Sequence, residues 1–316
     1  LEPRAEPGGD RRDGPGAARA GGGRRRMKVA YLGPAGTFSE EALGLAAAGA
    51  AYEPLPVATI PAAVEAVESG ASERALVPFE NSIEGTVRPT LDALAFDAAR
   101  VRIVGEFDHR VHQMLIAARA IEPAEVTRVL SHPQPLAQCA RFLRAELPGA
   151  AVEAVSSTSE AVRRVVEGTD EPWAALGSAA AAGAYGGVVL REDVEDVPDN
   201  VTRFVWLAAG EDERPAAEPD RPWRTTLVFD ELGADHPGAL VDALSVLADR
   251  DINRTRIESR PRRSGLGSYM FFIDLDGSAG DETVAAGIAA LRERAGNVRV
   301  LGSYQVGAAA PLPPAA

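Results

Sequence analysis

The sequence predicts an α/β protein with a second, smaller unit at its C-terminal end. From Lys28 onward, short apolar runs typical of buried strands alternate with helical stretches. After Ala209 an acidic, proline-rich segment, GEDERPAAEPDRP, interrupts this pattern without apolar anchors, as expected of a linker. Beyond the linker the pattern reads strand, helix, strand, strand, helix, strand. This is the order of a ferredoxin-like βαββαβ domain.

Each element of the first unit rests on its own apolar pattern. Apolar, β-branched runs predict strands, and stretches rich in alanine and leucine between them predict helices. In the helix predicted at 135–147, Leu136, Ala140, Leu143 and Leu147 fall on one face, and Gly149 is a stop signal. The predicted strands are residues 28–33, 75–80, 101–107, 126–131, 150–157, 173–178 and 204–209, and the predicted helices are 40–49, 88–96, 135–147 and 159–168.

The second unit follows the linker at residues 210–222. Its predicted strands are 224–232, 254–261, 268–277 and 297–304, and its predicted helices are 238–250 and 281–294. Residues 1–26, rich in glycine, arginine, proline and alanine, have almost no large apolar side chains, and we expect a disordered arm there. We also expect an unstructured tail at residues 306–316.

Composition excludes several classes of function. The formal net charge of −13 argues against a nucleic-acid partner, because phosphate binding needs a basic surface. No apolar run is long enough to span a membrane. A single cysteine, Cys139, rules out an internal disulfide and fits a reducing compartment, so we expect a cytoplasmic protein.

Polar clusters open the helices that follow predicted strands. The clusters contain Thr37 with Glu40, then Glu80, Asn81 and Ser82, then Ser131 with Gln138, and Ser157 with Glu160. In an open α/β sheet such turns gather at the carboxyl ends of the strands, where backbone N–H groups and helix dipoles can hold an anion. Helix capping alone is the simpler alternative for any single cluster, although ENS and SHPQ hold more polar atoms than capping requires.

No metal or nucleotide motif stands out. The histidines at positions 109, 112, 132 and 236 are scattered, and Cys139 has no partner cysteine. We interpret His109 and His112 as sheet-edge or surface residues. The sequence has no P-loop, dinucleotide fingerprint or GxSxG motif. We therefore expect chemistry on an acid without metal or cofactor.

The longer motifs resemble a known family. The sequences YLGPAGTFSEEAL, VPFENSIEGTV, SHPQPLAQC, YGG and NVTRF occur in the order seen in prephenate dehydratase, and PGALV with ESRP resembles its ACT regulatory domain. The resemblance runs from Met27 to about Tyr304. It implies a two-lobed fold like that of type II periplasmic binding proteins, with lobe 1 at about 27–102 and 186–209 and lobe 2 at about 103–185. An ACT domain at 223–305 follows. The chain resembles monofunctional members, because residues 1–26 cannot form a chorismate mutase module.

The resemblance also implies the reaction and its residues. The family converts prephenate to phenylpyruvate, water and carbon dioxide without metal or cofactor. The threonine of its TRF motif corresponds to Thr202, the expected donor to the leaving hydroxyl, unless a protonated Glu80 takes that role. Arg203 either contacts the substrate's side-chain carboxylate or braces the loop through Asp199. The catalytic positions implied are Thr202, Asn81, Glu80, Ser131 and Gln138, and the substrate-binding positions are Thr37, Ser82, Arg203 and Phe204.

The ACT motifs imply feedback by the end product. Similarity to the family implies that phenylalanine binds between paired domains at Gly238, Ala239 and Leu240 and at Glu258, Ser259, Arg260 and Pro261. We therefore expect a homodimer or homotetramer. From the residues alone, a plain helix start and a charged strand remain the alternative. Arogenate dehydratase, which shares the motifs, and a non-catalytic sensor of small acids are the competing functions.

Overall fold

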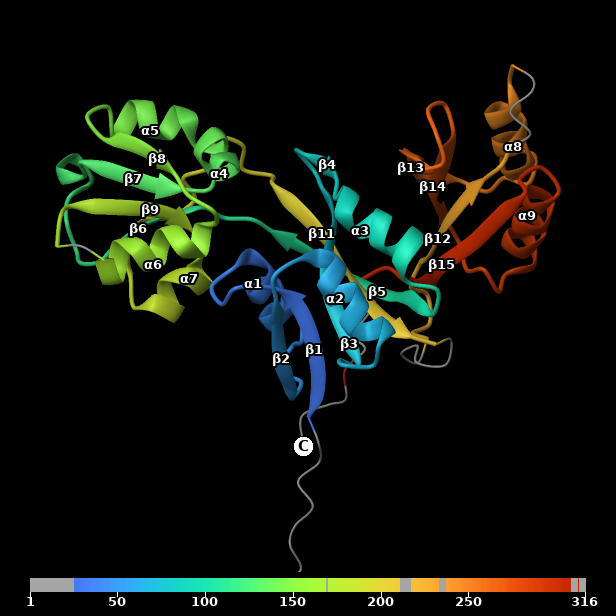
Figure 1. Ribbon diagram of the computed structural model, residues 1–316, viewed down its shortest axis with the longest axis horizontal. Helices are drawn as coiled ribbons and strands as arrows, with labels where there is room; N and C mark the ends of the chain where they lie inside the picture. The colour runs from blue at the N-terminus through green and yellow to red at the C-terminus, as the bar shows by residue number, and fades with distance from the viewer. Residues whose placement is uncertain (1–25, 169, 211–216, 233–236, 308–311, 313–316) are drawn as a thin grey trace, which may run out of the picture.

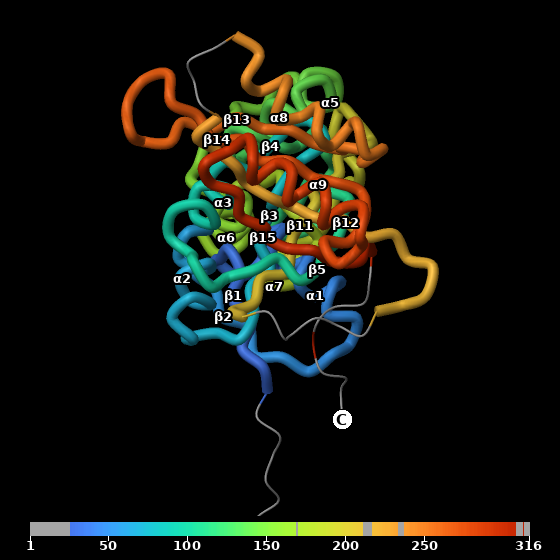
Figure 2. The backbone as a smooth tube through the Cα atoms, turned by 90° about the vertical axis from the view of Figure 1, so that its right-hand side faces the viewer, coloured from blue at the N-terminus to red at the C-terminus, as the bar shows by residue number. Residues whose placement is uncertain are grey.

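The computed structural model describes residues 26–168, 170–210, 217–232, 237–307 and 312. The chain forms a first lobe, a second lobe and a C-terminal domain. Figure 1 shows the second lobe and the C-terminal domain on opposite sides of the first lobe, and Figure 2 views the same arrangement from the side of the C-terminal domain. The first lobe therefore contacts both of the other parts.

The first lobe is built on one half of a ten-stranded sheet, in the order β5-β11-β3-β1-β2 with β4 paired to β3, and strands of the C-terminal domain form the other half. Helix α1 packs on one face of it, and α2 and α3 pack on the other. Strand β1 runs parallel to β2 and β3, and β11 runs antiparallel to β3 and β5. The elements are β1 (Met27–Leu32), α1 (Phe38–Ala46), β2 (Tyr52–Val57), α2 (Ile60–Glu68), β3 (Arg74–Asn81), β4 (Gly85–Thr86), α3 (Arg88–Asp92), the π-helical turn η1 (Ala93–Asp97), β5 (Val101–Arg110) and β11 (Val201–Ala209).

The second lobe has its own five-stranded sheet, in the order β10-β6-β9-β7-β8. Its helices cover both faces, and their apolar side chains form two separate clusters with the sheet. The elements are β6 (Met114–Ala117), the 3-10 turn η2 (Pro123–Glu125), β7 (Arg128–Ser131), α4 (Pro133–Gln138), α5 (Ala140–Glu146), β8 (Ala151–Ala154), α6 (Thr158–Gly168), β9 (Trp173–Gly177), α7 (Ala179–Tyr185) and β10 (Val188–Arg191).

The helix predicted at 135–147 is divided in the structure. Helix α4 ends at Gln138 and α5 begins at Ala140, because Cys139 between them leaves the helical region with φ −111° and ψ 16°. The apolar face is nevertheless continuous, since Cys139 and Leu143 belong to one buried cluster. The periodicity therefore located the buried face but not the break in the backbone.

The chain crosses between the lobes at different places from those expected. Strand β5 lies in the sheet of the first lobe, where it pairs with β11, and β10 lies in the second lobe, where it pairs with β6. The crossings are thus residues 111–113 and 192–200, whereas the sequence placed the second lobe at 103–185. Both differences come from pairing between strands distant in the sequence, which local patterns do not report.

The C-terminal domain has the predicted βαββαβ order. Helices α8 and α9 cover one face of its strands and enclose an apolar core. Its strand β15 also lies parallel to β5 of the first lobe, where Gly302 pairs with Ile103. A Cβ atom on Gly302 would clash with the Ile103 carbonyl oxygen, so only glycine permits this approach. The elements are β12 (Trp223–Asp230), α8 (Ala239–Ala248), β13 (Arg254–Pro261), β14 (Tyr269–Asp276), α9 (Glu282–Arg292) and β15 (Asn297–Gln305).

Some predictions fall on residues that the structure does not describe. They include the arm at 1–26, apart from Arg26, the linker at 211–216 and most of the tail at 306–316. In the described part of the chain, no helix has both the length and the apolar character that a membrane span requires.

Candidate active site

A cavity of about 430 Å³ lies between the two lobes. The first lobe contributes the end of β3, the start of β11 and the start of α1, and the second lobe contributes the starts of α4 and α6. Among the described residues that line it there is no lysine or arginine, and Glu84 is the only acid. The polar lining therefore consists mainly of amides and hydroxyls. Its members include Asn81, Thr86, Gln113, Gln138, Ser157, Asn200 and Thr202.

A β-bulge decides which side chains of β3 face this cavity. Thr202 pairs with Asn81, and Phe204 pairs with Pro78, so Phe79 is an extra residue between them. All four paired residues line the cavity, whereas Phe79 belongs to the apolar cluster on the α2 side of the sheet. The bulge thus allows Pro78 and Asn81, which are three positions apart on β3, to face the same side of the sheet.

The Thr202 hydroxyl accepts a hydrogen bond from Asn81 and donates none to the residues that the structure describes. Its Oγ1 accepts a hydrogen bond from Asn81 Nδ2 at 2.9 Å. The orientation of the Asn81 amide is set by its oxygen, which accepts the backbone N–H groups of Ile83 at 3.0 Å and Glu84 at 2.9 Å. Because the amide offers only N–H to Thr202, the hydroxyl hydrogen is left to donate to a molecule in the cavity.

The amides continue as a chain to the second lobe. Asn81 also donates to Asn200 Oδ1 at 2.7 Å, and Asn200 Nδ2 donates to Gln138 Oε1 at 3.3 Å. Gln138 reaches Glu84 Oε1 at 3.5 Å. The sequence identified Asn81 and Gln138 but missed Asn200, although its place two residues before Thr202 was a usable signal. The chain ties α4 of the second lobe to the end of β3 and the start of β11.

Gln113 is a second residue that sequence reasoning missed. Its side chain lines the cavity and is 1% exposed, and its Oε1 has no hydrogen-bond partner among the described residues. A buried acceptor without a partner costs free energy, so this oxygen is suited to a donor on a bound ligand. No local motif marks Gln113, because it lies in the short crossing between the lobes.

Three hydroxyls that we expected at the site donate hydrogen bonds to backbone carbonyls instead. Ser131 is fully buried and donates to the Leu176 carbonyl at 2.9 Å. Thr37 donates to the Leu32 carbonyl at 2.9 Å while capping α1, and Ser82 donates to the Asp199 carbonyl at 3.0 Å. None of the three is among the residues that line the cavity. The structure therefore places these three hydroxyls next to the site, bonded to backbone carbonyls and outside the lining of the cavity.

Glu80 and Arg203 face away from the cavity. Alternation along β3 and β11 turns them to the opposite side of the sheet from Asn81 and Thr202, where they pair at 2.7 Å. Arg203 also pairs with the buried Asp274 of the C-terminal domain at 2.8 Å. This placement does not support Glu80 as the proton donor. Arg203 therefore links parts of the protein through Glu80 and Asp274. The expected alternative was a link through Asp199, but Asp199 pairs with Arg110 at 3.9 Å.

Charges on this face stabilise one another. Burial alone would lower the pKa of Arg203, but Asp274 and the other acids around it raise the pKa above its ordinary value. Burial alone would raise the pKa of Asp274, but Arg256 and Arg203 hold it below its ordinary value. Both groups are therefore charged near neutral pH and form a buried ionic link between the first lobe and the C-terminal domain.

Two sequence motifs form a contact between the lobes, which we call the clasp. The loop before α1 presents backbone carbonyls to α7, where Ser178 Oγ donates to Gly36 at 3.0 Å and the Tyr185 hydroxyl donates to Ala35 at 3.1 Å. Gly36 has φ +78°, and a Cβ on it would lie 3.0 Å from Ala181 Cα. Gly36, the second glycine of GPAG, and Tyr185, the tyrosine of YGG, thus allow the two lobes to pack closely.

The expected effector motifs lie on the C-terminal domain, and one of them contacts the first lobe. Gly238, with φ 98°, precedes α8, which begins with Ala239 and Leu240. On β13, which also carries Ser259 and Pro261, Glu258 accepts a hydrogen bond from Thr86 Oγ1 at 3.2 Å. Arg260 binds both carboxylate oxygens of Asp92, at 2.7 and 3.0 Å. Because Thr86 lines the cavity, the ESRP motif is connected to the site by a single side-chain contact.

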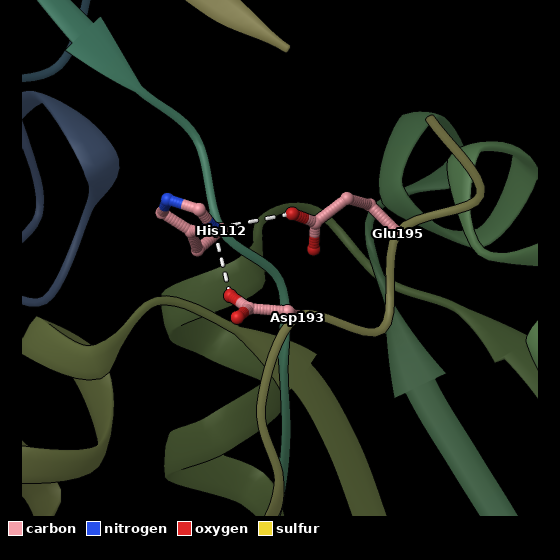
Figure 3. Close-up of side chains that lie close together, drawn as sticks. All are labelled: His112, Asp193 and Glu195. Atoms are coloured by element: carbon pink, nitrogen blue, oxygen red, sulfur yellow. Dashed lines mark hydrogen bonds and ion pairs between the residues drawn. The ribbon is translucent and has the colours of Figure 1, made fainter. Parts of the chain in front are cut away.

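His109 and His112 have unlike surroundings. His109 is buried at 4% exposure on β5, where it pairs with Thr202 of β11, and this burial contradicts the expected surface position. His112 is half-exposed and lies close to Asp193 and Glu195 (Figure 3). Within the described residues, this trio is the only group of three or more His, Cys, Asp or Glu side chains placed to share a metal ion. It lies in the crossings between the lobes, and none of its members lines the cavity.

Comparison with known proteins agrees with this geometry. The family model for prephenate dehydratase matches residues 29–212, and that for the ACT domain matches residues 226–293. A prephenate dehydratase of Mycobacterium sp. (strain JLS) is 40% identical over 297 residues, covering 91% of each chain.

Solved structures also resemble the chain over most of its length. The structure of prephenate dehydratase from Arthrobacter aurescens in complex with L-Phe is 38% identical, covers 92% of each chain and superposes with a TM-score of 0.77. A structure described as GqqA, a novel type of quorum quenching acylase, is 30% identical with a TM-score of 0.77 and covers 89% of this chain and 98% of its own. With a family model matched over more than half of its length and a relative at 40% identity over nine-tenths of it, the chain belongs to the prephenate dehydratase family and carries an ACT domain.

Proposed function

We propose that this protein converts prephenate to phenylpyruvate, water and carbon dioxide in phenylalanine biosynthesis, and that phenylalanine regulates it through the ACT domain. The single observation that carries the catalytic proposal is the free proton of the Thr202 hydroxyl, held at the cavity by the oriented amide of Asn81.

The reaction needs help mainly at its leaving group. Loss of carbon dioxide and hydroxide makes the ring of prephenate aromatic, so the driving force lies in the substrate. The Thr202 hydroxyl is too weak an acid to surrender its proton outright. It donates a hydrogen bond to the departing hydroxyl and relays a proton from water as the carbon–oxygen bond breaks. Phe204 adds an apolar side chain to the lining of the same cavity.

The lining also suits the carboxylate that must leave. A guanidinium or ammonium group on the ring carboxylate would stabilise the substrate more than a transition state in which that charge moves into the ring. The described lining offers amides, hydroxyls, the imidazole of His132 and the N-termini of α1 and α6 instead. Ser157 Oγ accepts from the backbone N–H of Glu160 at 3.1 Å, which caps α6 and fixes its first turn. Such helix ends attract an anion without a full positive charge.

The acylase likeness suggests another reaction, which the site favours less. Hydrolysis of an amide by a hydroxyl nucleophile requires a base that takes the hydroxyl proton. Among the described residues, Thr202 Oγ1 is hydrogen-bonded to the Asn81 side-chain N–H, which donates to this oxygen and cannot accept its proton. A non-catalytic sensor would not need a donor of this kind.

One assay separates these functions. The full chain is offered prephenate, arogenate and an acylated amine in separate reactions, and phenylpyruvate, phenylalanine and free amine are measured. We expect phenylpyruvate from prephenate. Phenylalanine from arogenate alone would assign an arogenate dehydratase, free amine alone an acylase, and no product in any reaction a sensor.

Regulation follows from the ACT domain. The relative from Arthrobacter aurescens was solved in complex with L-Phe, and we propose that the same ligand binds here at Gly238–Leu240 and at the ESRP motif. Isothermal titration should give one phenylalanine per chain. Gly238→Val should abolish this heat, because valine is strained at φ 98°. Retained binding in that variant would remove the site from consideration.

We also propose a homodimer or homotetramer in the cytoplasm. Strand β13 ends the ten-stranded sheet and carries Ile257, whose side chain is 48% exposed. An open strand edge with an apolar side chain is suited to pairing with a second copy. Light scattering during gel filtration would give the number of chains, and a monomer at micromolar concentration would contradict this proposal.

A further inference from the structure

We propose that His112, Asp193 and Glu195 form a binding site for a divalent metal ion of the zinc class, which joins the two crossings between the lobes. His112 belongs to the crossing at 111–113, and the two acids belong to the crossing at 192–200. His112 and Glu195 are 83 positions apart in the sequence. The site is separate from the catalytic cavity and takes no part in the proposed reaction.

The geometry is that of ligands around a common centre. The Nδ1 atom of His112 lies 2.7 Å from an Asp193 oxygen and 3.2 Å from a Glu195 oxygen. Figure 3 shows both carboxylates directed toward this one ring nitrogen. One N–H cannot donate along two directions with good geometry. Zinc bonds of about 2.0–2.2 Å to nitrogen and oxygen in tetrahedral geometry place neighbouring ligand atoms roughly 3.3 Å apart. Small side-chain rotations would therefore admit an ion.

The charge of the cluster also favours a cation. With a neutral imidazole, two adjacent carboxylates leave two negative charges. The Glu195 side chain is 3% exposed, so water screens its charge poorly. Its other oxygen accepts the backbone N–H of Gln113 at 2.8 Å, which leaves the first directed at His112. A buried carboxylate such as that of Glu195 is normally paired with a cation or bound to a metal, and a divalent ion would neutralise it together with the exposed Asp193.

The surroundings hold these ligands in place and relate the site to the cavity. The crossings are already joined by backbone bonds, from Val194 N to Gln113 O at 3.0 Å and from Val111 N to Asn200 O at 2.8 Å. The Gln113 bond to Glu195 orients that carboxylate, as hydrogen bonds behind metal ligands generally do. Gln113 and Asn200 both line the cavity. An ion would thus add a further link between the two crossings and stiffen the segments that carry Gln113 and Asn200.

The ligand types select the metal. Imidazole nitrogen suits zinc and its neighbours in the transition series, whereas magnesium prefers oxygen ligands alone and retains its water. The protein offers three ligand atoms, and the half-exposed position leaves room for water as a further ligand. We therefore expect zinc to bind well ahead of magnesium.

Metal binding to the full chain tests the proposal without any substrate. After removal of metal with a chelator, Zn²⁺ is titrated against a chromophoric indicator, and we expect one saturable site per chain. Asp193→Asn, at an exposed position, and Glu195→Gln, which keeps an oxygen for the Gln113 N–H, should each weaken binding about 10-fold or more. Glu192→Gln, an exposed neighbour outside the cluster with the same change of charge, should bind as the parent does.

Thermal unfolding supplies a second measurement. Zn²⁺ should raise the Tm of the parent and of Glu192→Gln, because an ion that binds only the folded state stabilises it. The same concentration of Mg²⁺ should leave the Tm unchanged, as should Zn²⁺ with Asp193→Asn. Absence of saturable zinc binding, or equal affinity in the parent and Asp193→Asn, would overturn the proposal. Since no turnover is measured, the result does not depend on the proposed reaction.

Discussion

The Asn81 side chain donates a hydrogen bond to the hydroxyl oxygen of Thr202 over 2.9 Å, and two backbone N–H groups fix the direction of that amide. A threonine alone would rotate its hydroxyl freely. Because its acceptor position is occupied by Asn81, the hydroxyl is oriented before the substrate arrives. This preorganisation is the physical basis for assigning a donor role to a neutral side chain.

Removing the Thr202 hydroxyl should therefore abolish most of the turnover of prephenate without unfolding the protein. We expect Thr202→Ala to lower kcat by about 10²–10³, the typical effect of removing one oriented donor. Thr202→Ser should retain much of the rate. Ser131→Ala provides the matched control, because its hydroxyl binds the Leu176 carbonyl outside the cavity. Steady-state rates of phenylpyruvate formation measure all three, and a near-normal rate in Thr202→Ala would falsify the donor role.

Replacing the Asn81 amide by a carboxylate should reverse the hydrogen bond to Thr202. In Asn81→Asp one oxygen still accepts the N–H groups of Ile83 and Glu84, so the turn is kept. The second oxygen can only accept, and it captures the Thr202 proton that the substrate needs. We expect kcat to fall about as far as in Thr202→Ala, and Tm to fall as well, because the carboxylate also loses the hydrogen bond to Asn200 Oδ1. Comparable rates for Asn81→Asp and the parent would show that the direction of this bond is unimportant.

The buried link between Arg203 and Asp274 should make stability depend on pH. The pKa of Asp274 lies below its ordinary value in the folded state, so its contribution is complete above the unfolded pKa of about 3.9 and is lost as pH falls below it. Asp274→Asn should cost about 3–5 kcal/mol of unfolding free energy at pH 7, because Arg203 and Arg256 lose their buried partner. Urea denaturation at several pH values should show this difference shrinking below pH 4. A difference independent of pH would contradict the assignment.

The Asp92 contact should restrain the effector motif. Arg260 is bound by both oxygens of Asp92, and Glu258 is bound by Thr86, so phenylalanine would have to compete with the first lobe for these side chains. Asp92→Asn weakens the ion pair with Arg260. We therefore expect phenylalanine to bind about 5-fold more tightly, which is at the lower end of the usual coupling between sites. Asp97→Asn, an exposed acid a turn further along, is the control. Isothermal titration with phenylalanine measures the affinity of each variant. Unchanged or weaker binding in Asp92→Asn would argue against competition between phenylalanine and the first lobe.

The sequence predicted the order of elements and the motifs of the site, but not which side chains face the cavity. Thr202, Asn81 and Gln138 were identified, and they do meet there. Glu80 was grouped with Asn81 by adjacency, yet the alternation of the strand turns it to the other face, while the bulge at Phe79 brings Pro78 to the cavity side. Ser131 was grouped with Gln138 by motif, although it ends a buried strand. Local patterns do not specify the registers that decide these directions.

The crossings between the lobes were the least predictable part. They are short, have no periodicity and are defined only by the long-range pairing of β5 with β11 and of β10 with β6. Gln113 and Asn200 reach the cavity from these segments, and His112 meets Glu195 across a separation of 83 positions. No spacing rule applied to a single chain would have joined residues so distant. Their proximity is a consequence of the two-lobed topology.

The clasp between the lobes predicts opposite effects for two glycines near α1. Gly36 has φ +78° and contacts Ala181 of the second lobe, so Gly36→Ala should lose about 1–2 kcal/mol from the left-handed backbone alone. Gly44 lies inside α1 with nothing within 4 Å of an added Cβ, and Gly44→Ala should gain about 0.5–1 kcal/mol from helix propensity. Only Gly36→Ala should also reduce kcat/KM, because the added methyl pushes the lobes apart. Tm values and prephenate kinetics for both variants test this, and equal shifts of the same sign would disprove the clasp.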